Sequence, residues 1–479
     1  MSDSRIHPTT SPDAATGTPS TDPATIPNLV AATRAEFDRG ATHSLAWRRR
    51  QLLGIEALVV EREQELAAAL ADDLGKSPDE AFITELSQVR AEARTARRHL
   101  RRWLRSTPVA VPPALVPASA RTRFEPLGLA LIIAPWNYPV QLALSPLVGA
   151  VAAGNAVVLK PSELAPATSA TLARLLPNYV DADAVQVVEG GVEESTALLA
   201  ERWDAILYTG GGRVGRIVAR AAAEHLTPTI LELGGKSPCF VDGTVDLRTA
   251  ADRIVWGKFM NAGQTCVAPD YLLVTDEIAD RLVDELVASI DRRFGASPLD
   301  SPDYGRIVSA SHFERLSGML GDGRVVTGGE TDRARLRIAP TILRDVPDDA
   351  PLMQEEIFGP LLPVRRVRDA DEAIAFIRAR PKPLALYTFT DDRRVRRAFE
   401  RRTSSGSLVE GMTLAQLAIT GLPFGGVGES GMGAYHGRAS LRAFSHEKAI
   451  VRKPLRPDTF ALTYPPLDRT RASLLRRLL

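Results

Sequence analysis

Apolar residues recur along this chain with two different periods, and the change of period divides the chain into regions. Residues 28–106 carry apolar side chains at helical spacing with charges between them, which predicts helices over 31–37, 46–71 and 80–104. After a proline-rich break at 108–117, short apolar runs alternate with helical patterns. The expected strands are 129–135, 156–159, 185–188, 205–208 and 229–233, and the expected helices between them are 141–153, 167–176, 193–200 and 214–224. This alternation indicates a parallel sheet with helices on both faces, as in Rossmann-like dinucleotide-binding domains.

A second α/β pattern begins at residue 238. Its expected strands include 271–274, 324–327 and 384–389, and its expected helices include 246–259, 278–293 and 370–378. The segments 119–128 and 440–453 alternate enough between apolar and polar residues to form a separate hairpin-like arm. Residues 1–26 are rich in Pro, Ser, Thr, Asp and Ala without apolar periodicity, which predicts a disordered extension.

Composition excludes several classes of protein. The net charge of +1 gives no electrostatic footprint for nucleic acid, so we expect no nucleic-acid partner. No apolar run reaches the roughly 20 residues that a membrane span needs, so we expect no integral span. Two cysteines cannot build a disulfide framework, which favours a reducing, cytoplasmic location. We expect no metal site.

Cys266 lies in the stretch NAGQTCVAP at 261–269, where small residues let backbone and ligand approach the sulfur closely. Glu232 lies in LELGGKSP at 231–238. A thiolate nucleophile and a carboxylate base are what thioester chemistry on an aldehyde needs. The alternative is that Cys266 is only a small buried apolar residue. We interpret the other cysteine, Cys239, as a packing residue because it follows a strand pattern.

Asn137 follows the first strand of the alternating region, at the carboxyl edge where α/β sheets place ligands. Its side-chain amide could donate to a developing oxyanion, or it could cap the helix that follows. The next strand is followed by Lys160, Ser162 and Glu163, and its Lys and Glu suit the hydroxyl groups of an adenosine ribose. The alternative for Lys160 and Glu163 is a surface ion pair of little energetic value.

A glycine loop joins a strand to a helix in the stretch YTGGGRVG at 208–215, which contains Gly210, Gly211 and Gly215. Such glycines let a pyrophosphate approach the N–H groups at a helix N-terminus, although the spacing is not that of the usual dinucleotide fingerprint. Farther along, Glu356 could hold a nicotinamide ribose while Phe358 packs near the ring. The alternative is a turn with a solvated Glu and a core Phe.

Together these stretches resemble the aldehyde dehydrogenase superfamily, and within it the class 3, fatty-aldehyde branch, over residues 28 to 454. The resemblance implies that Cys266 is the nucleophile, Glu232 the general base, and Asn137 with the Cys266 backbone N–H the oxyanion hole. It also implies the cofactor positions Trp136, Lys160, Ser162, Glu163, Gly210, Gly211, Gly215, Leu233, Gly234, Glu356 and Phe358. The chain departs from the pattern where Gly211 replaces a Ser, and where Glu410 and Glu429 replace an Asp and an Asn.

The expected fold class is α/β: a Rossmann-like dinucleotide-binding domain, a second α/β catalytic domain and a small β oligomerisation arm. The expected ranges are 1–26 for the disordered extension, 27–118 and 129–235 for the NAD(P)-binding domain, 236–439 for the catalytic domain, 119–128 and 440–454 for the arm, and 455–479 for the C-terminal tail. Residues 469–479 could form a short basic amphipathic helix over the substrate entrance.

The expected function is NAD(P)-dependent oxidation of an aldehyde to a carboxylic acid. We expect NAD to be preferred, NADP to be tolerated and the protein to be a homodimer. Two alternatives stay open. One is a relative that passes the acyl group to coenzyme A, although such relatives typically lack a Glu at position 232. The other is a catalytically silent binding or structural protein on the same fold.

Overall fold

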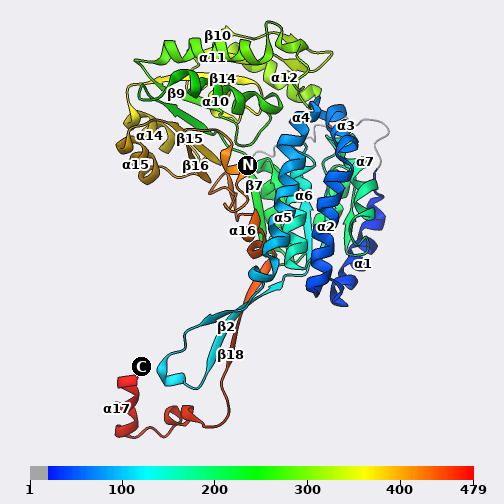
Figure 1. Ribbon diagram of the computed structural model, residues 1–479, viewed down its shortest axis with the longest axis vertical. Coiled ribbons are helices and arrows are strands. Elements are labelled where there is room, and N and C mark those ends of the chain that lie inside the picture. The colour runs from blue at the N-terminus through cyan, green and yellow to red at the C-terminus, as the bar shows by residue number, and fades with distance from the viewer. Residues whose placement is uncertain (1–19, 479) are drawn as a thin grey trace, which may run out of the picture.

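The computed structural model describes residues 20–478, and it divides into two α/β bodies and a projecting arm (Figure 1). The first body contains a six-stranded sheet in the order β17-β7-β6-β3-β4-β5, parallel except for β17 at its edge. Its strands are β3 (Leu129–Ile133), β4 (Ala156–Lys160), β5 (Val185–Val187), β6 (Ala205–Gly210), β7 (Thr229–Leu233) and β17 (Gly431–Met432). Every residue of β3 and β4 is buried, as expected for parallel strands covered on both faces.

Helices cover this sheet on both sides. They are α1 (Ile26–Asp38), α2 (Leu45–Glu61), α3 (Glu63–Leu74), α4 (Pro78–Ala81), α5 (Ser87–Trp103), α6 (Gln141–Ala153), α7 (Pro166–Leu175), α8 (Val192–Ala200) and α9 (Gly212–Ala223). The single helix predicted over 46–71 is two helices, because the backbone leaves helical geometry at Arg62. The helix predicted over 80–104 contains a π-helical turn at Phe82–Leu86 before α5.

Residues 20–26 contradict the predicted extent of the disordered extension. Asp22 caps a 3₁₀ turn over Pro23–Thr25, and α1 begins at Ile26, whose side chain is completely buried. The prediction was wrong here because one buried apolar residue in a polar stretch shows no periodicity. Residues 1–19 of the predicted extension lie outside the described residues.

The second body is built on a seven-stranded sheet in the order β10-β13-β14-β9-β8-β15-β16, parallel except for β10. Its strands are β8 (Pro238–Val241), β9 (Tyr271–Thr275), β10 (Arg324–Thr327), β13 (Thr341–Arg344), β14 (Leu361–Val367), β15 (Ala385–Phe389) and β16 (Ser407–Glu410). Its helices are α10 (Leu247–Phe259), α11 (Ala279–Phe294), α12 (Ala310–Gly318), α13 (Pro351–Gln354), α14 (Ala370–Arg378) and α15 (Arg393–Arg402). A two-stranded sheet pairs β11 (Thr331–Asp332) with β12 (Arg337–Ile338).

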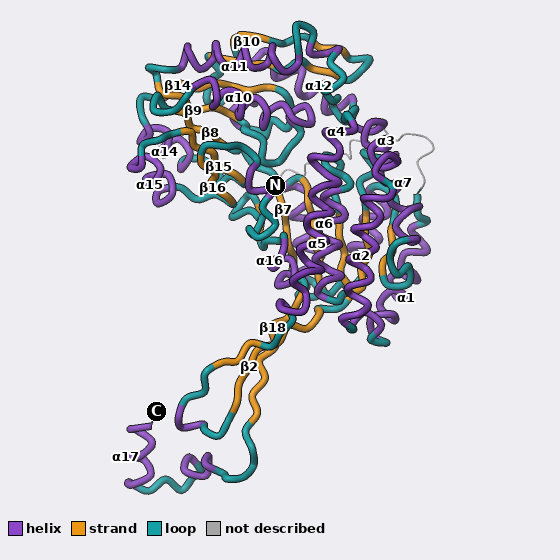
Figure 2. Tube along the Cα trace, in the orientation of Figure 1, coloured by secondary structure: helices purple, strands orange, loops and turns teal. Residues whose placement is uncertain are grey.

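The arm is a three-stranded antiparallel sheet in the order β1-β2-β18, which projects away from both bodies (Figure 2). Strand β2 (Ser119–Pro126) pairs along its whole length with β18 (Ser445–Arg452). The short strand β1 (Thr107–Val109) also pairs with β2, so the 107–118 segment belongs with the arm rather than with the nucleotide-binding domain to which it was assigned. Conversely, residues 440–443 are helical, in α16 (Gly437–Ala443), and do not continue β18.

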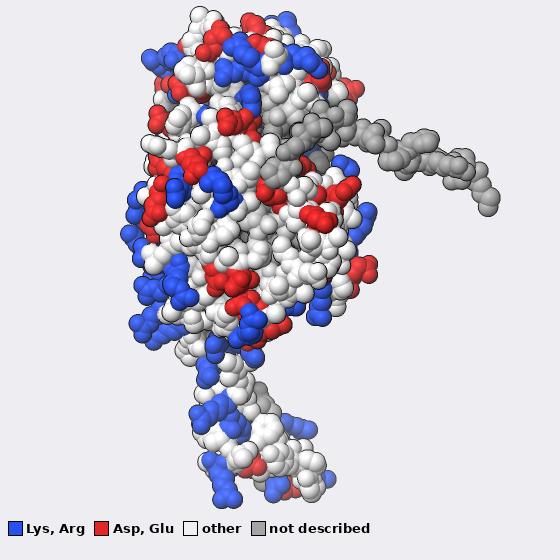
Figure 3. Space-filling view, turned by 90° about the vertical axis from the view of Figure 1, so that its right-hand side faces the viewer, with Lys and Arg blue, Asp and Glu red and all other residues white. Residues whose placement is uncertain are grey.

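The C-terminal tail ends in α17 (Arg469–Leu478), which lies beside the tip of the arm and far from both bodies (Figure 1). Within one chain, therefore, this helix does not cover a substrate entrance. Among residues 20–478 no helix combines the length and the apolar character needed to cross a membrane. Basic and acidic side chains are interspersed over the face of the molecule that Figure 3 shows.

Candidate active site

A cavity of about 660 Å³ collects the three predicted catalytic side chains, although they come from distant parts of the sequence. Asn137 follows β3, Glu232 lies within β7, and Cys266 follows α10 in the second body. The two α/β bodies therefore both contribute to the walls of one site. The cavity is also lined by seven of the predicted cofactor residues: Trp136, Gly210, Gly211, Leu233, Gly234, Glu356 and Phe358.

The loop that carries Cys266 has an unusual backbone, which explains its small residues. Asn261 and Ala262 have φ of 53° and 51°, and Gly263 follows with φ of 76°. A Cβ atom on Gly263 would lie 2.2 Å from the carbonyl oxygen of Gly359. Only glycine fits this left-handed, crowded position. The turn therefore reverses the chain after α10 and presents Cys266 to the cavity.

The surroundings of Cys266 favour the protonated thiol. Burial raises the pKa of the Cys266 thiol well above its usual value, and the nearby carboxylates of Glu232 and Glu356 raise it further. The backbone N–H groups of Cys266 and Val267 act in the opposite direction. A thiolate at this position therefore needs a base or an added positive charge before it can attack.

Asn137 is held by bonds at both its side chain and its backbone. Its side-chain amide donates to the carbonyl oxygen of Gln264 at 3.1 Å, and its own carbonyl oxygen accepts from Asn261 at 2.7 Å. A carboxamide nitrogen carries two N–H groups, so one remains for a ligand in the cavity. The alternative role as a helix cap does not hold, because the Glu85 carboxylate accepts the N–H groups of Val140 and Gln141 where α6 begins.

Glu232 is almost completely buried within β7, between β6 and β17. Neither oxygen of its carboxyl group has a hydrogen-bond partner among the described residues. Burial alone raises the pKa of Glu232 well above its usual value. Buried polar groups are normally paired, so an unpaired carboxyl group facing a cavity is typical of a functional site.

The Glu356 carboxylate lies against Gly234, two positions after Glu232. A Cβ atom on residue 234 would lie 1.9 Å from the Glu356 carboxylate in its present position, so glycine permits the close approach. Burial, reinforced by Asp270, raises the pKa of Glu356 to about 8, while the Gly235 N–H, Lys236 and other cations oppose that rise. One oxygen of Glu356 is buried without a partner among the described residues.

Two aromatic side chains form a wall beside this carboxylate. The rings of Trp136 and Phe358 meet edge to face, with centroids 5.3 Å apart. Phe358 has a left-handed φ of 49°, so its backbone is held in a conformation that large side chains seldom adopt. The Glu356–Phe358 turn therefore faces the cavity and is not a solvated surface turn.

The glycine loop ends β6 and begins α9. Gly211 is the N-cap residue of α9 and has open space where a side chain would be. Gly210 approaches Tyr208 so closely that a Cβ atom would lie 2.3 Å from its hydroxyl. No acidic residue lies in the first turn of α9, so its free N–H groups and positive dipole end can take an anion. Gly215 lies one turn later and packs on the cavity residue Leu233, but it does not line the cavity itself.

Lys160 is the last residue of β4, Ser162 and Glu163 follow it, and none of the three is part of the cavity lining. The Lys160 ammonium pairs with the Glu163 carboxylate at 2.8 Å, but only the Glu163 side chain is well exposed, at 43%. Ser162 accepts the N–H of Leu164 at 3.3 Å, which fixes the turn after the strand. Because Lys160 is buried, this pair differs from an ordinary surface ion pair.

Two cavity residues on α12 were missed by the sequence analysis. His312 and Arg315 lie one helical turn apart and both line the cavity. Burial lowers the pKa of His312 to about 4, so its ring is neutral, and the ring lies 5.2 Å from that of Trp136. Arg315 donates to the carbonyl oxygen of Ile357 at 2.7 Å. The only signal in the sequence was that these two basic side chains lie three positions apart. Many solvent-exposed helices have the same spacing.

The chain is similar in sequence to known proteins over most of its length. The model of the aldehyde dehydrogenase family matches residues 3–450. Aldehyde dehydrogenase family 3 member H1 of Arabidopsis thaliana is 47% identical over 456 residues, which cover 94% of both chains. Human aldehyde dehydrogenase family 3 member B1 is 47% identical over 92% of this chain and 95% of its own.

Solved structures also superpose on this chain over most of its length. The substrate-bound state of Staphylococcus aureus AldH superposes with a TM-score of 0.92 at 41% identity, covering 94% of this chain and 99% of that chain. An NAD-dependent aldehyde dehydrogenase from Sinorhizobium meliloti superposes with a TM-score of 0.84 at 30% identity, covering 92% of this chain and 89% of its own.

Proposed function

The chain belongs to the aldehyde dehydrogenase family, and from this premise we propose that Cys266 is its nucleophile, Glu232 its general base and Asn137 its oxyanion donor. The enzyme is an NAD(P)-dependent aldehyde dehydrogenase. One observation supports the residue roles above the others: the thiol of Cys266 and the unpaired carboxyl group of Glu232 face the same buried cavity.

The chemistry begins at the sulfur of Cys266. After loss of the thiol proton, which the raised pKa of Cys266 opposes, the sulfur attacks the aldehyde carbonyl carbon and forms a C–S bond. The carbonyl oxygen gains the negative charge. Asn137 and the backbone N–H of Cys266 donate to that oxygen and stabilise it.

Oxidation leaves a thioester on Cys266, and Glu232 completes the cycle. A nicotinamide coenzyme held by Glu356, Trp136 and Phe358 would supply the hydride acceptor for the former aldehyde carbon. Glu232 then takes a proton from a water molecule, and the resulting hydroxide attacks the thioester. The C–S bond breaks and the carboxylic acid leaves, while the departing sulfur takes up the proton held by Glu232 and returns to the thiol.

The residues present fit a dinucleotide. The N-terminus of α9 offers N–H groups to a pyrophosphate, and Gly211 leaves open space there. Glu356 has an oxygen free for ribose hydroxyl groups, and Trp136 with Phe358 would pack near the nicotinamide. Lys160, Ser162 and Glu163 would hold the adenosine ribose at the end of β4.

Coenzyme preference follows from Glu163. An exposed carboxylate accepts a hydrogen bond from the 2′-OH of NAD, whereas the 2′-phosphate of NADP would meet a like charge. Because Glu163 is 43% exposed, it can swing away from a phosphate. We therefore propose that NAD is preferred and NADP tolerated.

Hydrolysis is favoured over transfer to coenzyme A because the base at position 232 is present and points into the cavity. The test is to incubate the enzyme with NAD and a panel of aliphatic and aromatic aldehydes, with and without coenzyme A. The carboxylic acid should form at the same rate in both cases. Acyl-coenzyme A as the main product, or no NADH with any aldehyde, would overturn the proposal.

We also propose a cytoplasmic homodimer. The arm presents a long outer edge at β18, eight residues with mostly exposed side chains, and unpaired edges of this kind are normally covered. Both cysteines are free thiols, which suits a reducing compartment.

A further inference from the structure

A buried ion pair next to the active site has no part in the mechanism above. The side chains of Lys76 and Glu85 are completely buried, and the Lys76 ammonium lies 2.5 Å from the Glu85 carboxylate. Removing two charges from water costs more than their attraction returns unless further hydrogen bonds satisfy them. The other groups that Lys76 and Glu85 bind should therefore explain why the ion pair is buried at this position.

Both members of the pair hold the segment that contains Asn137. The Lys76 ammonium donates to the carbonyl oxygen of Asn137 at 3.0 Å and lies 4.1 Å from the centroid of the Tyr138 ring. The second oxygen of Glu85 accepts the N–H groups at the start of α6, at 2.8 and 3.0 Å. The segment between β3 and α6 is thus fixed at two points by one ion pair.

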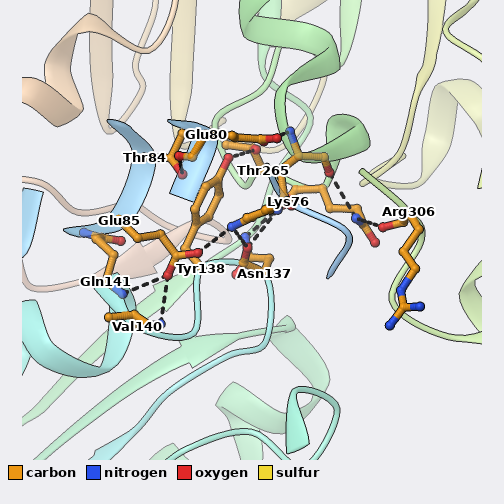
Figure 4. A network of polar contacts seen from close by, with 12 residues as sticks. Lys76, Glu80, Thr84, Glu85, Asn137, Tyr138, Val140, Gln141, Thr265 and Arg306 are labelled. Carbon is orange, nitrogen blue, oxygen red and sulfur yellow. Dashed lines mark hydrogen bonds and ion pairs between the residues drawn. The ribbon is translucent and has the colours of Figure 1, made fainter. Parts of the chain in front are cut away.

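The same segment is bonded to the loop that carries Cys266 (Figure 4). The hydroxyl groups of Tyr138 and Thr265 lie 2.6 Å apart, and the Asn137 amide donates to Gln264. The side chain of Asn261 donates back to the Asn137 carbonyl oxygen, the same atom that Lys76 binds. Asn137 and Cys266 belong to different α/β bodies, so these contacts set the distance between the two donors of the oxyanion hole.

We propose that Lys76, held by Glu85, is a positioning residue that orients Asn137 toward the oxyanion. Oxyanion donors act only when they are placed close to their productive geometry, and an error of about 1 Å can cost on the order of 100-fold in rate. The inference rests on the proposed role of Asn137. Lys76 touches neither substrate nor coenzyme and acts through the Asn137 backbone.

The decisive variant is the double substitution Lys76→Met with Glu85→Gln, which removes both charges of the pair so that neither member is left buried without the other. The pre-steady-state burst of NADH and the coenzyme-free hydrolysis of 4-nitrophenyl acetate should both fall about 10- to 100-fold. Alkylation of Cys266 by iodoacetamide should stay within about twofold of wild type, because alkylation forms no oxyanion. A general loss of structure would slow all three reactions together and would overturn the proposal.

Combination with Asn137→Ala separates a positioning role from an independent one. If Lys76 acts through Asn137, the double substitution should add almost nothing to the loss caused by Asn137→Ala. Multiplicative losses, or an unchanged burst in the double variant, would contradict the proposal. The comparison is made relative to wild-type turnover, so a wild type that fails to oxidise aldehydes would count against the proposed function and not against this inference.

Two further variants keep the test decisive. Glu85→Gln alone is isosteric and keeps an oxygen for the α6 N–H groups. If the double variant does not fold, this single variant is tested in the same three assays with the same expected outcomes. Arg34→Met is the matched control, since it breaks an ion pair with Asp204 before the start of β6, at the sheet edge opposite the cavity. The control should lower thermal stability without changing the burst, whereas an equal loss of burst in Arg34→Met would show that destabilisation alone explains the effect.

Discussion

The side-chain amide of Asn137 donates a hydrogen bond to the backbone carbonyl of Gln264, 3.1 Å away, although the two residues belong to different α/β bodies. Gln264 lies two positions before Cys266, so the bond ties the proposed oxyanion donor to the loop of the proposed nucleophile. The proposed active site is therefore an assembly across two domains. Its function depends on contacts that neither domain makes alone.

Cys266→Ala should abolish aldehyde oxidation and leave NADH binding within about twofold of wild type, because the nucleophile is distinct from the coenzyme contacts. Cys239→Ala is the matched control. Cys239 is completely buried in β8 and does not line the cavity, so an aldehyde cannot reach its thiol. Steady-state rates and fluorescence titration with NADH measure both effects. A dead Cys239→Ala enzyme beside an active Cys266→Ala enzyme would reverse the assignment.

Glu232→Gln should keep the NADH burst and reduce the steady-state rate by about 100-fold or more, since loss of a general base typically costs on the order of 10²–10⁴-fold. The pKa of Glu232 lies above its usual value, and only the deprotonated form is a base. Wild-type turnover should therefore rise with pH through this raised pKa, and the variant should lose that rise. Stopped-flow measurements across a range of pH give the NADH burst and the steady-state rate. Full steady-state turnover in Glu232→Gln would contradict the role of Glu232 as the general base.

Gly234→Ala should raise the KM for NAD by at least about tenfold, because the new methyl group would collide with the Glu356 carboxylate. Gly318→Ala offers the matched control: residue 318 has φ of −61°, has open space around its Cβ position and does not line the cavity. Its KM for NAD should change by less than about threefold. Equal effects of the two substitutions would argue against a coenzyme contact at Glu356.

Glu163→Gln should narrow the preference for NAD over NADP, because it removes the charge that repels a 2′-phosphate. The measurement is kcat/KM for both coenzymes in wild type and variant. Preference for NADP in the wild type, or the same ratio in both proteins, would contradict the assignment of Glu163 to the adenosine ribose.

Light scattering of the purified protein should give the mass of a dimer. The monomer has a mass of 51.8 kDa, so a monomer, dimer and tetramer are easily separated. The physical reason for the prediction is the exposed edge of β18 in the arm. A monomer or a tetramer would count against an arm that joins two subunits.

Local patterns predicted the elements with strong boundary signals. The helices expected over 141–153 and 370–378 were found as α6 and α14 with those same ends. Gly154, with φ of 94°, terminates the first, and Asp369 caps the second. Both signals are local, so they can be read without knowing the fold.

Other features depend on contacts that no local pattern contains. Strand β17 has only two residues and exists because it pairs with β7, and β1 contains a proline that argued against a strand. Lys76 and Glu85 carry no local signal of burial in the sequence, whereas they form a buried pair. The cavity residues themselves were recognisable because their chemistry demands particular residue types, while their neighbours on α12 were not.

The most direct test of the account is to identify the residue that carries the acyl group. Glu232→Gln is mixed with NAD and an aldehyde, quenched after one turnover in acid, digested and examined by mass spectrometry. The account predicts that the peptide containing Cys266 gains the mass of the acyl group while the peptide containing Cys239 does not. NADH formation with Cys266 unmodified, or with the acyl group on another residue, would contradict it.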